Sequence, residues 1–166
     1  LLWLNQHYIK ECPSERLVQE MVPFWKQWGA NTDDHDFLIH VCDNLKSRAK
    51  TLAELAESSL FYFMDEITYE SEAADAFLKA EIAVHLATVA ERIPSLQDYS
   101  KKGIEAFLRT LAEEKGFKLK VIAQPLRVAL TGKTVSPGID DIMVTLGKER
   151  VIKRIARAVE YIKNKG

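Results

Sequence analysis

The sequence predicts an all-α protein. Apolar side chains recur at intervals of three and four residues through most of the 166 positions, and no run alternates between apolar and polar residues as a half-buried strand does. Because 47% of the residues are hydrophobic and 28% are charged, the chain can bury one or two compact cores without a disulfide or a metal. The longest apolar runs are far shorter than the ~20 residues that cross a bilayer, so we expect no membrane contact.

The first two helices are predicted from capping residues and apolar spacing. Ser14 can cap a helix that continues to Gly29, and Pro23 is expected to kink it. Polar residues at positions 31–33 can cap a second helix, which we expect to end near Ser47.

Two further helices are predicted before position 95. Thr51 starts the first of them, ahead of apolar residues at helical spacing. Ser71 is expected to cap one long alanine-rich helix that continues to Ile93, where Pro94 stops it.

Glycines and prolines divide the next part of the chain. A helix around Leu108 should end at Gly116, which has the place that a C-terminal glycine usually takes. The apolar stretch 119–130 is interrupted at Pro125, so we expect a new helix to start there, with Arg127 in its first turn.

Two helices are predicted at the end of the chain. Ser136, Pro137 and the carboxylates that follow are typical of a helix start, and Gly147 should end this short helix. The last helix buries Val151, Ile155, Ala158, Val159 and Ile162. A separate stripe of cations follows the same helix at positions i, i+3, i+4 and i+7: Arg150, Lys153, Arg154 and Arg157.

The net charge of −1 conceals two regions of opposite charge. Residues 1–114 hold 11 basic and 20 acidic side chains, a net of −9, whereas residues 115–166 hold 12 basic and 4 acidic, a net of +8. This asymmetry indicates either a surface for a polyanion such as a nucleic acid near the end of the chain or two domains with differently solvated surfaces. Charge alone leaves both readings open.

Several kinds of chemistry find no support in the sequence. Gly132-Lys133-Thr134 resembles the end of a phosphate-binding loop, but that motif needs a glycine where Arg127 stands. No zinc-site spacing joins the four histidines and two cysteines: His7, His35, His40, His85, Cys12 and Cys42. The cysteines are expected to be reduced thiols of a cytoplasmic protein. We assign no catalytic residue, no metal and no cofactor to this chain.

Arg48 and Arg127 are candidates for reading an unpaired RNA base. A planar guanidinium can bond to a base edge through two parallel hydrogen bonds, and loop bases are the usual targets of sequence-specific RNA readers. Arg48 is predicted at a helix end beside Lys46 and Lys50, where an ordinary surface arginine would also lie. The aromatic residues have helical spacing and are expected in the core.

The carboxy-terminal motifs resemble those of bacterial glutamyl-tRNA synthetases. The resemblance rests on Gln124-Pro125-Leu126-Arg127-Val128-Ala129-Leu130-Thr131-Gly132, on Ser136-Pro137-Gly138, and on Leu146-Gly147-Lys148-Glu149-Arg150-Val151 with Arg154. Weaker likenesses are Trp3-Leu4-Asn5 with Tyr8 and Ile9, and Arg48 to Leu55, which resembles an Arg-x-x-Thr-Leu helix junction. Together these segments extend the resemblance over essentially the whole chain.

The family resemblance implies two helical subdomains that form an anticodon-binding helix cage. With the break at Pro94, we expect an acidic subdomain at 1–94 and a basic subdomain at 95–166. The implied partners are the anticodon arm of the glutamate tRNA and the catalytic domain of the same polypeptide, with no DNA. The chain lacks the catalytic signatures of the family, so ATP and magnesium are expected in a catalytic domain outside it.

The resemblance also implies roles for individual residues. Arg48 would inspect the last anticodon base and Arg127 the middle of the anticodon. Ser136, Pro137 and Ile139 would line the pocket of the first anticodon base, although the family often has leucine where this chain has Ile139. Phosphate contacts are possible for the basic stripe, which could equally be a solvated face. The competing interpretation is a helical protein-interaction domain that docks another synthetase or an amidotransferase.

Overall fold

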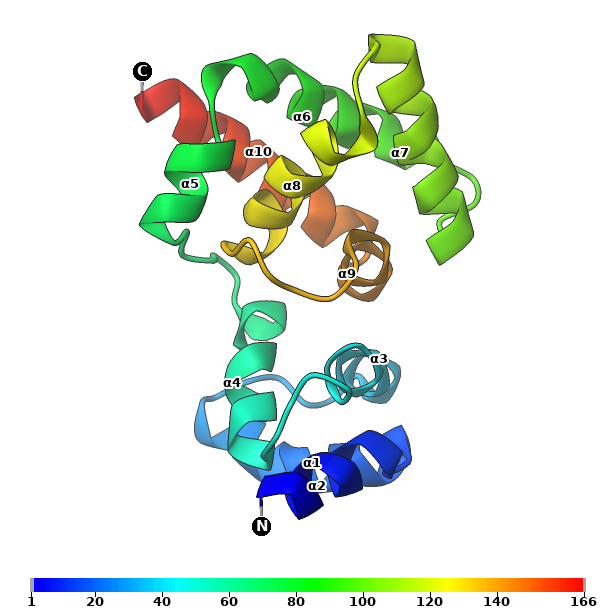
Figure 1. The fold of residues 1–166 in the computed structure, drawn as a ribbon, viewed down its shortest axis with the longest axis vertical. Helices are drawn as coiled ribbons and strands as arrows, with labels where there is room; N and C mark the ends of the chain where they lie inside the picture. Colours follow the sequence, from blue (N-terminus) through cyan, green and yellow to red (C-terminus); the bar gives the residue numbers. More distant parts are fainter. Residues whose placement is uncertain (1, 166) are drawn as a thin grey trace. The chain divides into compact units, whose positions relative to one another are not determined.

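The structure, a computed structural model, describes the backbone of residues 2–165 and the side chains of residues 5–165. Within those residues every regular element is a helix (Figure 1). The all-α prediction is therefore confirmed. The side chain of Trp3, one of the residues behind the family resemblance, lies outside the described residues.

The chain folds into two compact units, Leu1–Asp65 and Glu66–Gly166. This division differs from the predicted one after Pro94, because α6 (Ala80–Arg92) packs on α8 (Leu119–Thr131) and α10 (Lys148–Lys165) of the basic region. Pro94 produces only a 3-10 turn, η1 (Ile93–Ser95), inside the second unit. The boundary between the two compact units therefore does not coincide with the change from acidic to basic sequence.

In its described residues the first unit contains four helices, of which α2, α3 and α4 pack on one another. Its centre includes Trp25, which is fully buried and donates its indole N–H to Ser59 Oγ at 2.9 Å. The bounds of the helices are α1 (Leu2–Glu11), α2 (Ser14–Gln27), α3 (His35–Leu45) and α4 (Leu52–Phe63).

The helix caps observed in the first unit agree only in part with those predicted from the sequence. Thr51 caps α4 as predicted and accepts a hydrogen bond from Glu54 N at 3.0 Å. Ser14 does not cap α2, because its hydroxyl instead donates to the carboxylate of Asp43 on α3. The cap of α3 is Asp34, immediately after the three residues that the sequence had suggested.

The second unit contains the remaining helices, and Figure 1 shows α6, α8 and α10 crossing within it. Beside α6 and η1, its helices are α5 (Ser71–Phe77), α7 (Lys101–Lys115), α8 (Leu119–Thr131), α9 (Ile139–Leu146) and α10 (Lys148–Lys165). Gly116 and Gly147 end α7 and α9 as predicted, with φ values of 76° and 84° that favour glycine.

Two predictions about helix continuity are wrong. The long helix expected from Ser71 is divided at Leu78, which turns fully into the core and is followed by extended backbone at Lys79. The opposite occurs at Pro125, where α8 continues without interruption and Arg127 lies well inside the helix. Burial of both faces of α8 compensates for the one backbone hydrogen bond that a proline removes.

Gly132, at the end of α8, fixes where the next loop begins. Its φ of 80° suits glycine, and a Cβ here would lie 2.1 Å from the carbonyl oxygen of Thr68. Its own carbonyl accepts a hydrogen bond from Glu70 N at 2.9 Å. The segment 66–70 is thereby fastened against the start of the loop 132–138, which leads to α9.

Candidate nucleic-acid interface

Residues from three helices of the second unit line an open pocket of about 340 Å³. We call it the α7–α8–α9 pocket after the elements that form it. It is lined by Glu105 and Leu108 from α7, Leu119 and Arg127 from α8, and Gly138, Ile139 and Asp140 at the start of α9. The lining thus joins apolar side chains to one cation and two carboxylates.

The side of the pocket on α7 follows from the amphipathic pattern of that helix. Ile104 and Leu108 are buried and fix the rotation of α7, which leaves Glu105 exposed at the pocket. Arg109 lies one turn later and donates to Glu105 Oε1 at 2.8 Å, so the carboxylate is oriented by an i,i+4 pair.

Arg127 reaches the pocket from the middle of α8. Its neighbours Leu126 and Val128 are fully buried, whereas its own side chain is half-buried and lines the cavity. The carbonyl of Arg127 accepts a hydrogen bond from Thr131 Oγ1 at 2.8 Å, and that hydroxyl also accepts one from Lys133 N at 3.0 Å. These bonds connect the helix that holds Arg127 to the turn after it.

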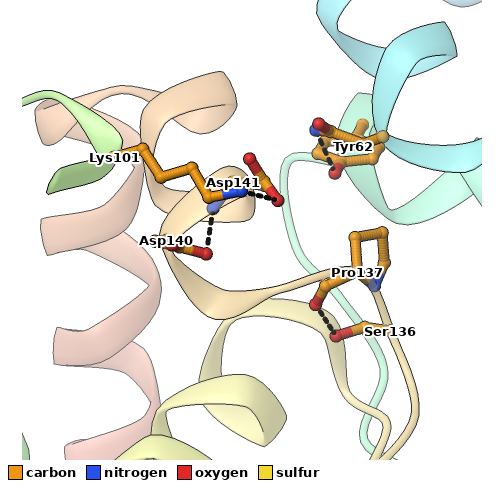
Figure 2. Close-up of polar contacts among 7 residues, drawn as sticks. Tyr62, Lys101, Ser136, Pro137, Asp140 and Asp141 are labelled. Atoms are coloured by element: carbon orange, nitrogen blue, oxygen red, sulfur yellow. Dashed lines mark hydrogen bonds and ion pairs between the residues drawn. The ribbon is translucent and has the colours of Figure 1, made fainter. Parts of the chain in front are cut away.

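The start of α9 forms the third side. Gly138 is the N-cap residue, and Asp140 Oδ1 accepts a hydrogen bond from Asp141 N at 2.9 Å. Lys101 at the start of α7 pairs with Asp141 at the start of α9 (Figure 2) and so links the two helices, with Nζ 3.3 Å from Oδ2. The hydrogen bond with Asp141 raises the pKa of the Lys101 ammonium above its usual value.

The predicted residues Ser136 and Pro137 lie in the loop before the pocket and do not line it. Ser136 was expected to cap the next helix, but its hydroxyl donates to the carbonyl of Pro137 at 2.8 Å (Figure 2), and the helix begins at Ile139. Of the predicted base-reading residues, the pocket therefore brings together Arg127 and Ile139, with Ser136 and Pro137 in the segment that leads to them.

Arg48 belongs to the first unit and is exposed in the turn that follows α3. Its backbone N–H donates to Leu45 O at 2.9 Å. Its neighbour Lys46 is engaged, since Nζ donates to Cys12 O at 3.1 Å and to Ser14 Oγ at 3.2 Å. The turn is thus fastened at Lys46 while the side chain of Arg48 is accessible to solvent.

The structure departs from the predicted basic stripe at Arg154. This side chain is only 4% exposed and donates to Leu130 O at 2.7 Å, one of the last carbonyls of α8. Such carbonyls have no partner within their own helix, and Arg154 supplies one. Lys153 is exposed, with Nζ 3.8 Å from Glu149, and Arg150 is half-buried.

Arg157 combines exposure with contacts to the segment 66–70. Its guanidinium donates to Ile67 O at 2.7 Å and lies 3.6 Å from the carboxylate of Glu66. It also lies over the ring of Tyr69, 5.9 Å from the ring centre. Part of the positive charge of α10 is therefore used to hold this segment in place.

Sequence reasoning missed the acidic side of the pocket. Glu105 belongs to no motif, and Asp140 is one of the carboxylates after Pro137 that the sequence assigns to a helix start. Only the packing of α7 against α8 and α9 brings these carboxylates to the cavity of Arg127. The only sequence feature near these carboxylates is Asp140-Asp141, which follows Pro137 and Gly138. That pattern indicates the start of a helix and gives no sign of a binding site.

Other reactive groups form no further site in the part of the chain that the structure describes. No group of three or more histidine, cysteine or acidic side chains there could hold a metal ion. Cys12 and Cys42 are buried free thiols, and burial raises the pKa of Cys42 to about 12, so this thiol is protonated near neutrality. No helix in the described range has the length and apolar character needed to span a bilayer.

Comparison with known proteins places most of the chain in one family. The sequence model of the anticodon binding domain matches residues 16–159. Glutamate–tRNA ligase 1 of Syntrophus aciditrophicus is 59% identical over 164 residues, which are 99% of this chain and 35% of that ligase. The glutamate–tRNA ligase of Geobacter sulfurreducens is 40% identical over 98% of this chain and 35% of its own length.

A solved structure agrees with these relatives. A glutamate tRNA ligase from Elizabethkingia meningosepticum, crystallised in complex with its amino acid, superposes with a TM-score of 0.89 at 27% identity. The match covers 97% of this chain and 32% of the ligase. The chain thus spans about a third of the length of the relatives it matches.

Proposed function

The chain belongs to the anticodon binding domain family, and from this membership we propose that it recognises the anticodon arm of a glutamate tRNA within a glutamate–tRNA ligase. The observation that carries the proposal is the α7–α8–α9 pocket, which lies within the residues matched by the family and holds Arg127 beside apolar walls. A guanidinium in such a cavity suits an unstacked loop base, which offers acceptors on its edge and a flat apolar face.

Each predicted site residue has a place in this proposal. Arg127 reads the edge of an anticodon base from α8, and Ile139 packs against a ring. Ser136 and Pro137 shape the loop that presents the pocket to RNA. Arg48 acts separately in the first unit, where its exposed guanidinium inspects the last anticodon base.

Phosphate contacts are proposed for Lys153, Arg150 and Arg157 of α10. The side chain of Lys153 is 76% exposed, against 42% for Arg157, and its pair with Glu149 at 3.8 Å is weak enough for a phosphate to replace. Arg154 is set apart from this group, because its guanidinium holds the end of α8.

The activity of the whole ligase belongs to the same proposal. Charging a tRNA with glutamate consumes ATP with magnesium, and we assign both to ligase residues beyond this chain. The only phosphate-loop-like sequence among the described residues, Gly132-Lys133-Thr134, lies at the turn after α8, where Gly132 packs against the segment 66–70. We also propose that the ligase acts in the cytoplasm.

A binding titration tests the proposed function. The 166-residue chain would be titrated into labelled anticodon-arm hairpins of the glutamate tRNA, with an anticodon-substituted hairpin as the control. We expect preferential binding to the native anticodon and a decrease of affinity with salt, with a log–log slope of about −0.7 for each phosphate contact. Equal affinity for both hairpins would contradict anticodon recognition. Binding only to another synthetase or an amidotransferase would favour a protein-interaction domain.

Arg48 is tested separately. In the full-length ligase, Arg48→Gln should weaken the preference for the native last anticodon base, because the planar guanidinium that can bond a base edge twice is lost. Exposed Lys50 in the same segment provides the control Lys50→Gln, which removes an equal charge. An unchanged relative rate of charging for tRNAs that differ at that base would contradict the assignment.

A further inference from the structure

The turn between α3 and α4 carries Arg48, and its backbone is held on both sides of this residue. The N–H of Arg48 donates to Leu45 O at 2.9 Å, and the next residue, Ala49, is only 2% exposed. Thr51 then caps α4 by accepting a hydrogen bond from Glu54 N at 3.0 Å. The side chain of Arg48 is exposed, so the point from which it reaches outward is set by the backbone of this turn.

Lys46 adds a connection from the turn to the junction between α1 and α2. Its Nζ donates to Cys12 O at 3.1 Å and to Ser14 Oγ at 3.2 Å. Cys12 is buried, and its own N–H donates to Tyr8 O at 2.8 Å, so the carbonyl that accepts from Lys46 belongs to a fixed part of the first unit. The Lys46 side chain is only 26% exposed. This lysine is therefore used inside the fold, where it fastens the end of α3.

Ser14 takes part in the same connection, and this explains why it does not make the predicted cap of α2. Its hydroxyl donates to the carboxylate of Asp43 on α3 and accepts from Lys46 Nζ. Departures from local helix rules are expected where a function constrains the structure. The three side chains join the start of α2 to the end of α3, directly before Arg48.

The position of Arg48 matters because a guanidinium distinguishes bases only when it is aligned with the base edge. Two parallel hydrogen bonds require both N–H groups to lie in one plane with two acceptors of the base. A turn that moved freely would have to be ordered on binding, at a cost in affinity. That cost would fall on the native base alone, because a base without the matching acceptors does not form the paired bonds.

We propose that Lys46 is a positioning residue for base recognition, which holds the turn of Arg48 against Cys12 and Ser14 and so directs the guanidinium. This inference rests on the proposed role of Arg48 in reading the last anticodon base. Lys46 acts through Arg48 and not by contact with RNA. Its loss should therefore change the choice between bases more than the general affinity for tRNA.

The test measures that choice in the full-length ligase. The value of kcat/KM for charging would be compared between the native tRNA and a tRNA substituted at the last anticodon base. The unmodified ligase should favour the native tRNA at least about tenfold. Lys46→Met keeps the aliphatic stem but loses both hydrogen bonds, and it should reduce this ratio by about threefold or more. Lys46→Arg can still donate to both acceptors and should restore much of the ratio.

Two further variants separate positioning from charge and from folding. Lys50→Met removes the same charge from an exposed position in the same segment as Arg48, and it should keep the full ratio. Ser14→Ala removes the hydroxyl that Lys46 and Asp43 share without altering any charge, and it should lower the ratio too. The alanine variant is the milder change, so it provides the test if Lys46→Met does not fold.

A double-mutant cycle supplies a measurement that a general loss of stability would not change. In an Arg48→Gln background the guanidinium is absent, so Lys46→Met should lower the ratio no further. An additional loss of the same size in that background would show that Lys46 acts independently of Arg48, and it would overturn the inference.

The outcomes also separate this inference from the proposed function. A full ratio in Lys46→Met, even with kcat/KM lowered equally for both tRNAs, would overturn the positioning role and leave Arg48 as a base reader. An unchanged ratio in Arg48→Gln would overturn the role of Arg48 and the inference with it. Reduced ratios in Lys46→Met and Arg48→Gln that do not add, with Lys50→Met unchanged, would support both.

Discussion

Two regions of the second unit use arginine in different ways. On α10, Arg154 is 4% exposed and donates to Leu130 O at 2.7 Å, and Arg157 donates to another backbone carbonyl. In the α7–α8–α9 pocket, Arg127 lines a cavity together with Glu105. An arginine near an RNA-binding surface is therefore a candidate for reading a base only where the fold leaves room for a ligand beside its guanidinium.

The largest effect is expected at Gly132, which ends α8 and begins the loop that leads to α9. Gly132→Ala would place a Cβ 2.1 Å from Thr68 O at a φ of 80°, so the segment 66–70 or the loop 132–138 must move. Left-handed strain and overpacking together should lower the free energy of unfolding by roughly 3–4 kcal/mol. RNA affinity should fall too, because the loop leads to the pocket. Urea unfolding and hairpin titration would measure the two effects.

Gly116→Ala is the matched control for this prediction. Gly116 has a similar φ of 76°, but a Cβ there would meet nothing within 4 Å. Its cost should be about 1 kcal/mol, from backbone strain alone, with RNA affinity unchanged. Equal costs for the two variants would show that the contact between Gly132 and Thr68 does not hold the loop.

Arg154 provides the next largest effect and tests the structural side of the comparison. Arg154→Met fills similar space but leaves Leu130 O without its donor at the end of α8. We expect the free energy of unfolding to fall by about 2–3 kcal/mol, with RNA affinity unchanged under conditions where the variant is folded. Lys153→Met, at the neighbouring exposed position, should change stability little. A stable Arg154→Met variant with weakened RNA binding would return Arg154 to the phosphate-contacting group.

Substitution of Arg127 should have the opposite effects, with a loss of RNA affinity and little change in stability. Arg127→Gln is expected to reduce affinity for the native anticodon hairpin about tenfold or more, while the free energy of unfolding changes by less than about 1 kcal/mol. Lys153→Gln is the control for charge, and it should weaken all hairpins alike and reduce the salt slope by about one contact. If Arg127→Gln also weakened every hairpin equally, Arg127 would contact the backbone and not a base.

The same comparison explains how far the sequence could predict this molecule. Thr51, Gly116 and Gly147 were predicted correctly because capping and left-handed turns depend on a few neighbouring residues. The helix start expected at Pro125 was wrong, because burial of α8 outweighs the hydrogen bond that the proline removes. The single long helix expected from Ser71 was also wrong, because burial of Leu78 divides a segment of good helix propensity. Local rules therefore predicted most helices but not their continuity.

Some residues of the candidate site could be predicted from local sequence, and others could not. Arg127 and Ile139 could be proposed from a motif, whereas the burial of Arg154 depends on where α8 ends relative to α10. Glu105 lies on a helix with no motif at all and meets Arg127 only through the packing of three helices. Such convergence is a property of the tertiary structure, so no local pattern contains it.

The smallest effect is expected at the ion pair that joins α7 to α9. Lys101 lies 3.3 Å from Asp141, but its side chain is 61% exposed, so solvent and salt screen the attraction. Lys101→Gln should lower affinity for the native hairpin about twofold at low salt, by loosening the two helices that carry Glu105 and Asp140. The difference should vanish at high salt. Lys102→Gln, the adjacent exposed position, is the control for charge. A large and salt-independent loss in Lys101→Gln would instead place Lys101 in direct contact with RNA and extend the reading surface to the start of α7.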